Sequence, residues 1–146
     1  MSWRPLILAV AACAALLSCR EPSGREDFIA GKGPFVFSAD MTDTTRLYDF
    51  SFYTRLDGRP HLLSGVVDVP LDIAWTSPSG NVYAETVFLP LTDSSATFYS
   101  RQIRRDYRTD VLPVEAGVWE IAVSVPDSVD IPGLRGLGLV QHHKDR

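Results

Sequence analysis

Apolar and polar residues alternate with a period of two along several stretches of this chain. The stretch "LYDFSFYTRL", residues 47–56, places Tyr48, Phe50 and Phe52 at alternate positions, and "VWEIAVSV", residues 118–125, alternates in the same way. This period puts the apolar side chains on one face of a β-strand. Both stretches are therefore predicted to be strands with one buried face.

The stretch "LDIAWTSPSGNVYAETVFL", residues 71–89, predicts a hairpin, because two alternating halves flank a Ser-Pro-Ser-Gly-Asn turn sequence. Pro78 suits the first corner of a turn, and Gly80 or Asn81 can adopt a positive φ. Residues 94–108 fit a short helix or an irregular loop as well as a strand. Shorter strands are predicted at residues 35–39, 108–114 and 135–141.

Prolines recur from residue 60 onward and leave few places for a helix of ordinary length. Many short strands separated by turn signals favour an all-β fold. The prediction is an antiparallel β-sandwich of about seven to eight strands, either immunoglobulin-like or jelly-roll-like.

The N-terminus has the pattern of a secretory signal. Arg4 precedes an uninterrupted apolar run from Leu6 to Leu17, and polar residues follow from Arg20. A membrane-spanning helix needs about 20 apolar residues, so this run is too short to be one. Residues 1–18 are predicted to be a cleaved lipoprotein signal peptide.

The tetrapeptide Leu16-Leu17-Ser18-Cys19 resembles the bacterial lipobox, in which the cysteine is acylated and becomes the new N-terminus. Two or three acyl chains on Cys19 hold a protein stably at a membrane. The alternative is an ordinary signal peptide that contains two cysteines, Cys13 and Cys19. Arg20 and Glu21 differ from the aspartate that commonly retains lipoproteins at the inner membrane, so the outer membrane is the expected location.

The composition of the rest of the chain predicts how it divides into a tether and a folded domain. Residues 19–33 are rich in Gly, Pro and charge and are predicted to be the lipidated N-terminus and a flexible tether, with residues 34–146 forming a single domain. Removal of residues 1–18 leaves one cysteine, which excludes an intrachain disulfide. The chain is acidic, with a formal net charge of −4, and nucleic acid is not an expected partner.

Catalytic motifs are absent from the sequence. It has no G-x-S-x-G elbow, Walker loop, H-E-x-x-H pair or Cys/His cluster, so no catalytic residue, cofactor or metal ligand is predicted. His61 is expected in a loop, and the adjacent His142 and His143 are expected in a solvated tail. The glycine-rich stretch 133–140 is expected to serve strand packing rather than phosphate binding.

The stretch "IRRDYR", residues 103–108, is the one dense basic segment. Arg104, Arg105, Tyr107 and Arg108 are candidate partner-binding residues, because guanidinium groups pair bidentately with acidic oxygens. The alternative is a solvated loop in which neighbouring aspartates balance the charge.

Two aromatic residues beside the predicted turn bear on a second kind of function. Trp75 and Tyr83 lie on alternating strands and are predicted to be core residues. If exposed, they could stack on a sugar ring, so glycan binding stays open.

The order of these features is similar to that of the gliding motility lipoproteins of the GldH type, over Cys19 to about Gln141. The segments that carry the resemblance are Ser77-Pro78-Ser79-Gly80, Gly117-x-Trp119 and Gly133-Leu134-x-Gly136-x-Gly138. The resemblance implies an envelope lipoprotein associated with a motility apparatus and its linked secretion system. It implies no enzymatic activity and supplies no catalytic or ligand residues.

Two function classes follow. The first is a non-enzymatic envelope lipoprotein, anchored to the membrane at Cys19, that binds envelope proteins with its sheet surfaces or edges. The alternative is a lipoprotein that binds or processes surface carbohydrate, which an exposed aromatic row or a pair of carboxyl groups in a groove would favour.

Overall fold

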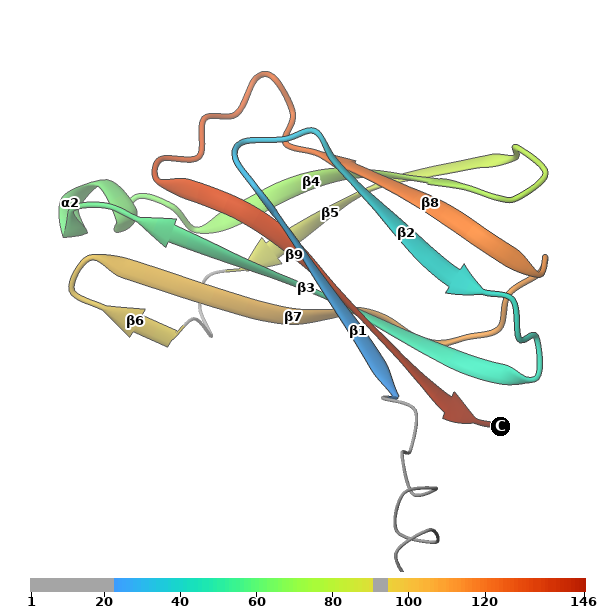
Figure 1. The fold of residues 1–146 in the computed structure, drawn as a ribbon. Helices are drawn as coiled ribbons and strands as arrows, with labels where there is room; N and C mark the ends of the chain where they lie inside the picture. Colours follow the sequence, from blue (N-terminus) through green and yellow to red (C-terminus); the bar gives the residue numbers. More distant parts are fainter. Residues whose placement is uncertain (1–22, 91–94) are drawn as a thin grey trace, which may run out of the picture.

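The computed structural model describes residues 23–90 and 95–146, and Cys19 lies outside these ranges. Two antiparallel sheets pack face to face in Figure 1, which confirms the predicted all-β sandwich. Eight strands have seven or more residues, and β6 has three. The strands are β1 (Gly24–Ala30), β2 (Phe35–Met41), β3 (Arg46–Asp57), β4 (Asp68–Thr76), β5 (Val82–Pro90), β6 (Ser95–Thr97), β7 (Ser100–Val111), β8 (Gly117–Ser124) and β9 (Leu134–Asp145).

The strand order identifies the sandwich as a jelly roll. One sheet has the order β1-β9-β3-β7-β6 and the other β2-β8-β4-β5. The pairs are nested around the central β4–β5 hairpin, since β3 pairs with β7, β2 with β8 and β1 with β9. This nesting, in which successive strands pass between the two sheets, distinguishes the fold from the immunoglobulin alternative.

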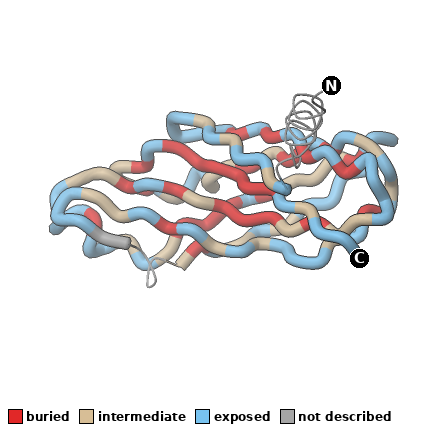
Figure 2. Tube along the Cα trace, turned by 60° about the horizontal axis from the view of Figure 1, so that its bottom comes forward, coloured by how far each residue is buried: buried red, intermediate tan, exposed pale blue. Residues whose placement is uncertain are grey.

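Alternation along the strands creates the core. Phe50 and Phe52 of β3 are fully buried, and Ile121 of β8 faces them from the other sheet. Figure 2 shows buried positions along the middle of the strands and exposed ones at the connecting ends. The hairpin turn has its predicted form, because Gly80 has φ of 93° and donates its backbone N–H to the Ser77 carbonyl at 2.9 Å.

The predicted tether at residues 19–33 is wrong from Gly24 onward. Residues Gly24–Ala30 form β1, which pairs antiparallel with β9 over its whole length. Phe28 stacks on Tyr53, and Ile29 packs against the core. The polar composition of residues 24–30 gives no sign of a strand. This edge strand is stabilised by backbone pairing with the distant β9 and not by an apolar run of its own.

Three other segments are more regular than the sequence predicts. Residues 95–97 and 100–111 are the strands β6 and β7, which leaves the helical option for 94–108 unsupported. His142 and His143 lie within β9 instead of a tail, and a short helix α2, Pro60–Leu63, contains His61. Among the residues that the structure describes, no helix is long and apolar enough to cross a bilayer.

The glycine-rich stretch serves strand packing, as predicted. Gly138 of β9 lies between Phe28 of β1 and Tyr53 of β3 in the register of the five-stranded sheet. A Cβ atom on Gly138 would lie 2.0 Å from ring carbons of Tyr53. The missing side chain allows the Tyr53 ring to lie over β9 and to meet Phe28.

Candidate functional site: an aromatic cleft beside strand β5

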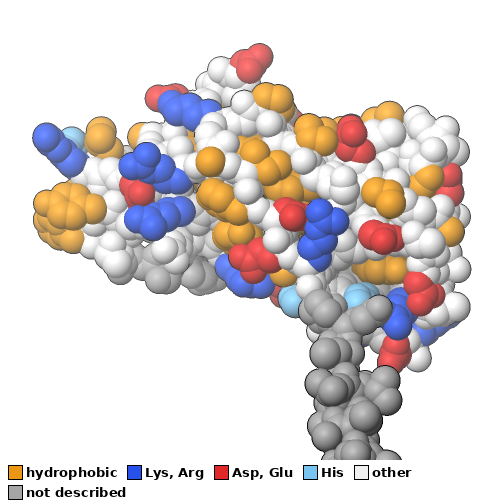
Figure 3. Space-filling model, in the orientation of Figure 1, with side chains coloured by type: hydrophobic (Ala, Val, Ile, Leu, Met, Phe, Trp, Pro, Cys, Tyr) orange, Lys and Arg blue, Asp and Glu red, His pale blue; other side chains and the backbone are white. Residues whose placement is uncertain are grey.

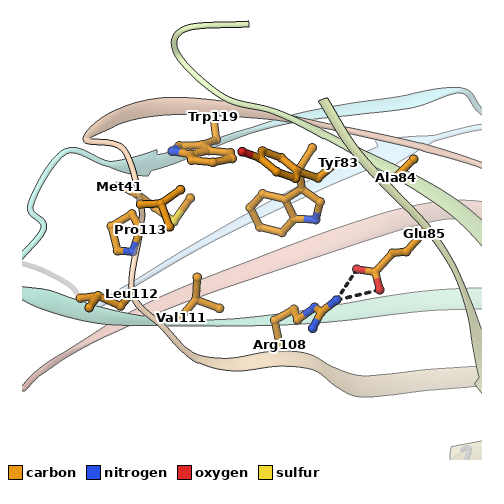
Figure 4. A pocket seen from close by; sticks show the side chains of 11 residues that line it. Met41, Tyr83, Ala84, Glu85, Arg108, Val111, Leu112, Pro113 and Trp119 are labelled. Carbon is orange, nitrogen blue, oxygen red and sulfur yellow. Dashed lines mark hydrogen bonds and ion pairs between the residues drawn. The ribbon is translucent and has the colours of Figure 1, made fainter. Parts of the chain in front are cut away.

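A cleft of about 370 Å³ opens at the side of the sandwich between β5, the edge strand of the four-stranded sheet, and β7 of the other sheet. Figure 4 shows aromatic side chains on one side of the cleft and an ion pair at its end. The lining residues are Met41, Trp75, Tyr83, Ala84, Glu85, Arg108, Val111, Leu112, Pro113, Val114 and Trp119.

Three aromatic rings form the wall of the cleft. Trp119 of β8 packs edge-on against Trp75 of β4 at a centroid distance of 6.2 Å, and Tyr83 of β5 lies 6.1 Å from Trp119. Trp119 is only 5% exposed and Trp75 is half-buried, but Tyr83 is 52% exposed. The prediction of a core position is therefore wrong for Tyr83, because β5 is an edge strand whose inner face is not fully covered.

The polar edges of both indoles are satisfied inside the protein. Trp119 Nε1 donates to the Glu115 carbonyl at 3.0 Å, and Trp75 Nε1 donates to the Tyr107 hydroxyl at 2.9 Å. The rings therefore present mainly apolar faces to the cleft.

Glu85 and Arg108 close the polar end of the cleft. Arg108 Nη2 donates to Glu85 Oε1 at 2.8 Å and to Oε2 at 2.7 Å, and the Tyr107 hydroxyl also donates to Oε1. Glu85 comes from the four-stranded sheet and its two donors from the five-stranded sheet, so this cluster joins the layers.

A β-bulge explains how two consecutive residues reach the same carboxylate. Ser51 of β3 pairs with Asp106, but the preceding residue, Phe50, pairs with Arg108, so Tyr107 is the extra residue on β7. A bulge breaks strict alternation and re-aims a side chain. Tyr107 and Arg108 are both directed towards Glu85 as a result.

The cluster shifts the pKa of each of its groups. Burial opposes the ionisation of Glu85, but the hydrogen bonds from Arg108 and Tyr107 keep its pKa below the ordinary value. Burial, followed by the hydrogen bond to Glu85, raises the pKa of Tyr107 to about 12. Glu85 is therefore an anion and Tyr107 a neutral donor at neutral pH.

The lining of the cleft offers apolar surface and one ion pair to a ligand. Glu85 is the one carboxylate among the lining residues, and it is held ionised by Arg108. A glycosidase needs a second carboxyl group across the bond that it cleaves. Within residues 23–90 and 95–146, no group of three or more His, Cys, Asp or Glu side chains could hold a metal ion.

The structure separates the predicted basic segment instead of presenting it as one surface. Arg108 lines the cleft and Tyr107 donates a hydrogen bond to Glu85 beside it. Arg104 pairs with Tyr53 in register and faces outward from the five-stranded sheet. Arg105 is half-buried and pairs in register with Phe52. Cys19, the predicted lipidation site, lies outside the described residues.

Glu85 is the residue that the sequence analysis missed. The sequence does contain an indication of its role. Glu85 lies two residues from Tyr83 and from Val87 along β5, so its side chain is on the same, inward-facing side of the strand. A charged residue at such a position requires a partner. The identity of that partner depends on β7, which pairs in the other sheet.

Comparisons with known proteins do not identify a family. No protein-family model matches the chain, and no curated protein matches it. An arabinose-bound α-L-arabinofuranosidase is similar in structure, with a TM-score of 0.32, 11% identity and coverage of 83% of this chain and 18% of that one. A structure of infectious bursal disease virus, Gt strain, gives a TM-score of 0.26, 13% identity and coverage of 84% and 37%. The chain thus spans well under half of either protein.

Proposed function

We propose that this chain is a non-enzymatic lipoprotein of the cell envelope, anchored through Cys19, that binds a protein partner at the cleft beside β5. The observation that carries the proposal is the position of an apolar cleft directly beside an edge strand. β5 pairs with β4 on one side, and no described strand pairs with its other side.

The partner that this geometry favours is an extended peptide segment. An unpaired strand edge offers backbone N–H and C=O groups to an added strand, and a neighbouring pocket accepts one of its side chains. The mouth of the cleft is apolar and exposed, with Tyr83 at 52%, Leu112 at 43% and Val114 at 85%. An apolar side chain would bury these surfaces along with its own.

The resemblance to the GldH-type lipoproteins supports an envelope assembly as the setting. It makes components of a motility or secretion apparatus the first partners to test. The outer membrane remains the proposed location, on the sequence around Cys19.

Site-specific photocrosslinking in the native envelope tests the proposal. A photoreactive residue at Tyr83 should yield an adduct with one envelope protein, and Val114→Asp should abolish it. Val67→Asp is the matched control, since Val67 is 71% exposed and does not line the cleft.

Two results would contradict this function. The first is the absence of any protein adduct from Tyr83 in cells that carry the intact lipoprotein. The second is equal loss of the adduct in both aspartate variants, which would place the contact elsewhere.

A further inference from the structure

The outer face of the five-stranded sheet carries a second depression, of about 760 Å³, that is separate from the cleft. Figure 3 shows Lys and Arg side chains gathered beside hydrophobic ones on the face in view, towards the end of the molecule that carries α2. The lining residues are Phe28, Tyr53, Thr54, Arg55, Asp57, Gln102, Ile103, Arg104 and Arg135.

Strand register brings three arginines together here from distant parts of the sequence. Arg104 of β7 pairs with Tyr53 of β3, and Arg55 pairs with Gln102. Arg135 comes from the start of β9 on the other side of β3. The set contains three guanidinium groups and one carboxylate, that of Asp57.

Two of the arginines, Arg55 and Arg135, each donate one hydrogen bond to the Asp57 carboxylate. Arg55 Nε donates to Asp57 Oδ1 at 2.6 Å, and Arg135 Nε donates to Oδ2 at 3.0 Å. The terminal nitrogens of both arginines stay available for a ligand. Arg104 makes no hydrogen bond or ion pair with any residue that the structure describes.

Aromatic rings border the same depression. The rings of Phe28 and Tyr53 stack at a centroid distance of 5.7 Å with 26° between their planes. Phe28 is 47% exposed, so part of its apolar surface stays open to solvent beside Tyr53. Exposed aromatic surface next to guanidinium groups suits a ligand that has both apolar C–H surface and anionic groups.

We infer that this depression binds a saccharide that carries carboxylate or phosphate groups. Arg104, Arg55 and Arg135 pair with the anionic groups, and the Phe28 ring packs against the sugar. The inference goes beyond the proposed protein-binding function, because none of these residues lines the cleft beside β5.

The position of the site favours a saccharide over a phospholipid of the anchoring membrane. β1 begins at Gly24, five residues after Cys19 in the sequence, and ends at Ala30, which pairs with Gly136 next to Arg135. This step rests on the anchor of the proposed function. At roughly 3.3 Å per residue the length of β1 places Arg135 about 20 Å from the point where the chain enters the domain.

Calorimetric titration of the full mature lipoprotein in neutral detergent tests the inference. The probes are trigalacturonate and glucose 6-phosphate, with maltotriose as the uncharged control. At least one anionic probe should bind with an affinity that falls as salt rises, and Arg104→Gln should weaken it about tenfold because a charge-assisted contact is lost. Arg25→Gln is the matched control, since Arg25 lies on β1 and pairs with Asp27 outside the depression.

Several results would overturn the inference. They are binding of neither anionic probe, equal affinity for maltotriose, and equal weakening by Arg25→Gln. Binding of short-chain phosphatidylglycerol, but of neither saccharide, with the same dependence on Arg104 would assign the site to lipid headgroups instead. Loss of protein crosslinking at Tyr83 has no bearing on any of these outcomes.

Discussion

Glu85 of β5 and Arg108 of β7 form an ion pair across the open side of the sandwich, with nitrogen–oxygen distances of 2.7 and 2.8 Å. Backbone hydrogen bonds stabilise each sheet internally, whereas contacts that involve side chains hold the two layers against each other. At this edge the core is incomplete, because the aromatic cleft lies between the layers. The ion pair therefore fixes the spacing of the two strands that border the cleft.

Replacement of Glu85 by glutamine should lower the free energy of unfolding by about 1 kcal/mol at pH 7, an estimate reduced for the partial exposure of both side chains. The pKa of Glu85 is lower in the folded protein than its ordinary value of 4.5. Its ionised form thus stabilises the fold above that value, and this contribution is lost as the pH falls through the folded pKa. Urea unfolding at pH 7 and pH 3 should show the difference between the two proteins shrink at acidic pH.

Glu120→Gln provides the control for the Glu85 experiment. Glu120 is exposed on β8 and has no ion pair among the residues described. Its substitution should change stability by less than about 0.5 kcal/mol. A Glu85 effect that is the same at both pH values would exclude the ion pair as its source.

Tyr107→Phe should destabilise the protein by about 1 to 2 kcal/mol, because the hydroxyl serves two partners at once. It accepts a hydrogen bond from Trp75 Nε1 and donates one to Glu85. The substitution leaves the half-buried indole N–H without an acceptor. A double-mutant cycle with Trp75→Phe measures this coupling, and simple additivity of the two losses would show that the hydrogen bond contributes nothing.

The strands that line the core could be predicted from the sequence because their inward faces are apolar. The predictions for β2, β3, β4, β5 and β8 agree with the structure to within a few residues at each end. β1 could not be predicted in this way, since one of its faces is open to solvent and its partner β9 lies more than 100 residues away along the chain.

The residues of the cleft could likewise be predicted only in part from the sequence. Tyr107 and Arg108 belong to a segment that the sequence marks as basic and aromatic, but a bulge opposite Phe50 decides where they point. Glu85, the residue that they share, lies in another sheet. Local patterns give the side chains that are available, and the pairing of distant strands decides which of them meet.

Gly133→Ala should destabilise the fold by more than about 2 kcal/mol, through both strain and collision. Gly133 has φ of 73°, and a Cβ atom there would lie 2.0 Å from the backbone oxygen of Asp57. Gly65→Ala is a matched control, because no atom lies within 4 Å of the position that its Cβ would take. Thermal unfolding of the two variants should differ clearly, and equal melting temperatures would refute the packing role of Gly133.

Cys19→Ala should release the protein from membranes without unfolding the domain. In the proposed function the anchor is a thioether on the Cys19 sulfur, and the buried core among the described residues begins within the strands, at Phe35. Cell fractionation should recover the wild-type chain with the envelope, and mass spectrometry should find it beginning at Cys19 with attached acyl chains. Cys13→Ala is the control, since Cys13 belongs to the segment expected to be removed, and it should leave anchoring intact. Full membrane retention of the Cys19→Ala chain, or an unmodified thiol at Cys19 in the native protein, would refute lipidation and the tethered function that rests on it.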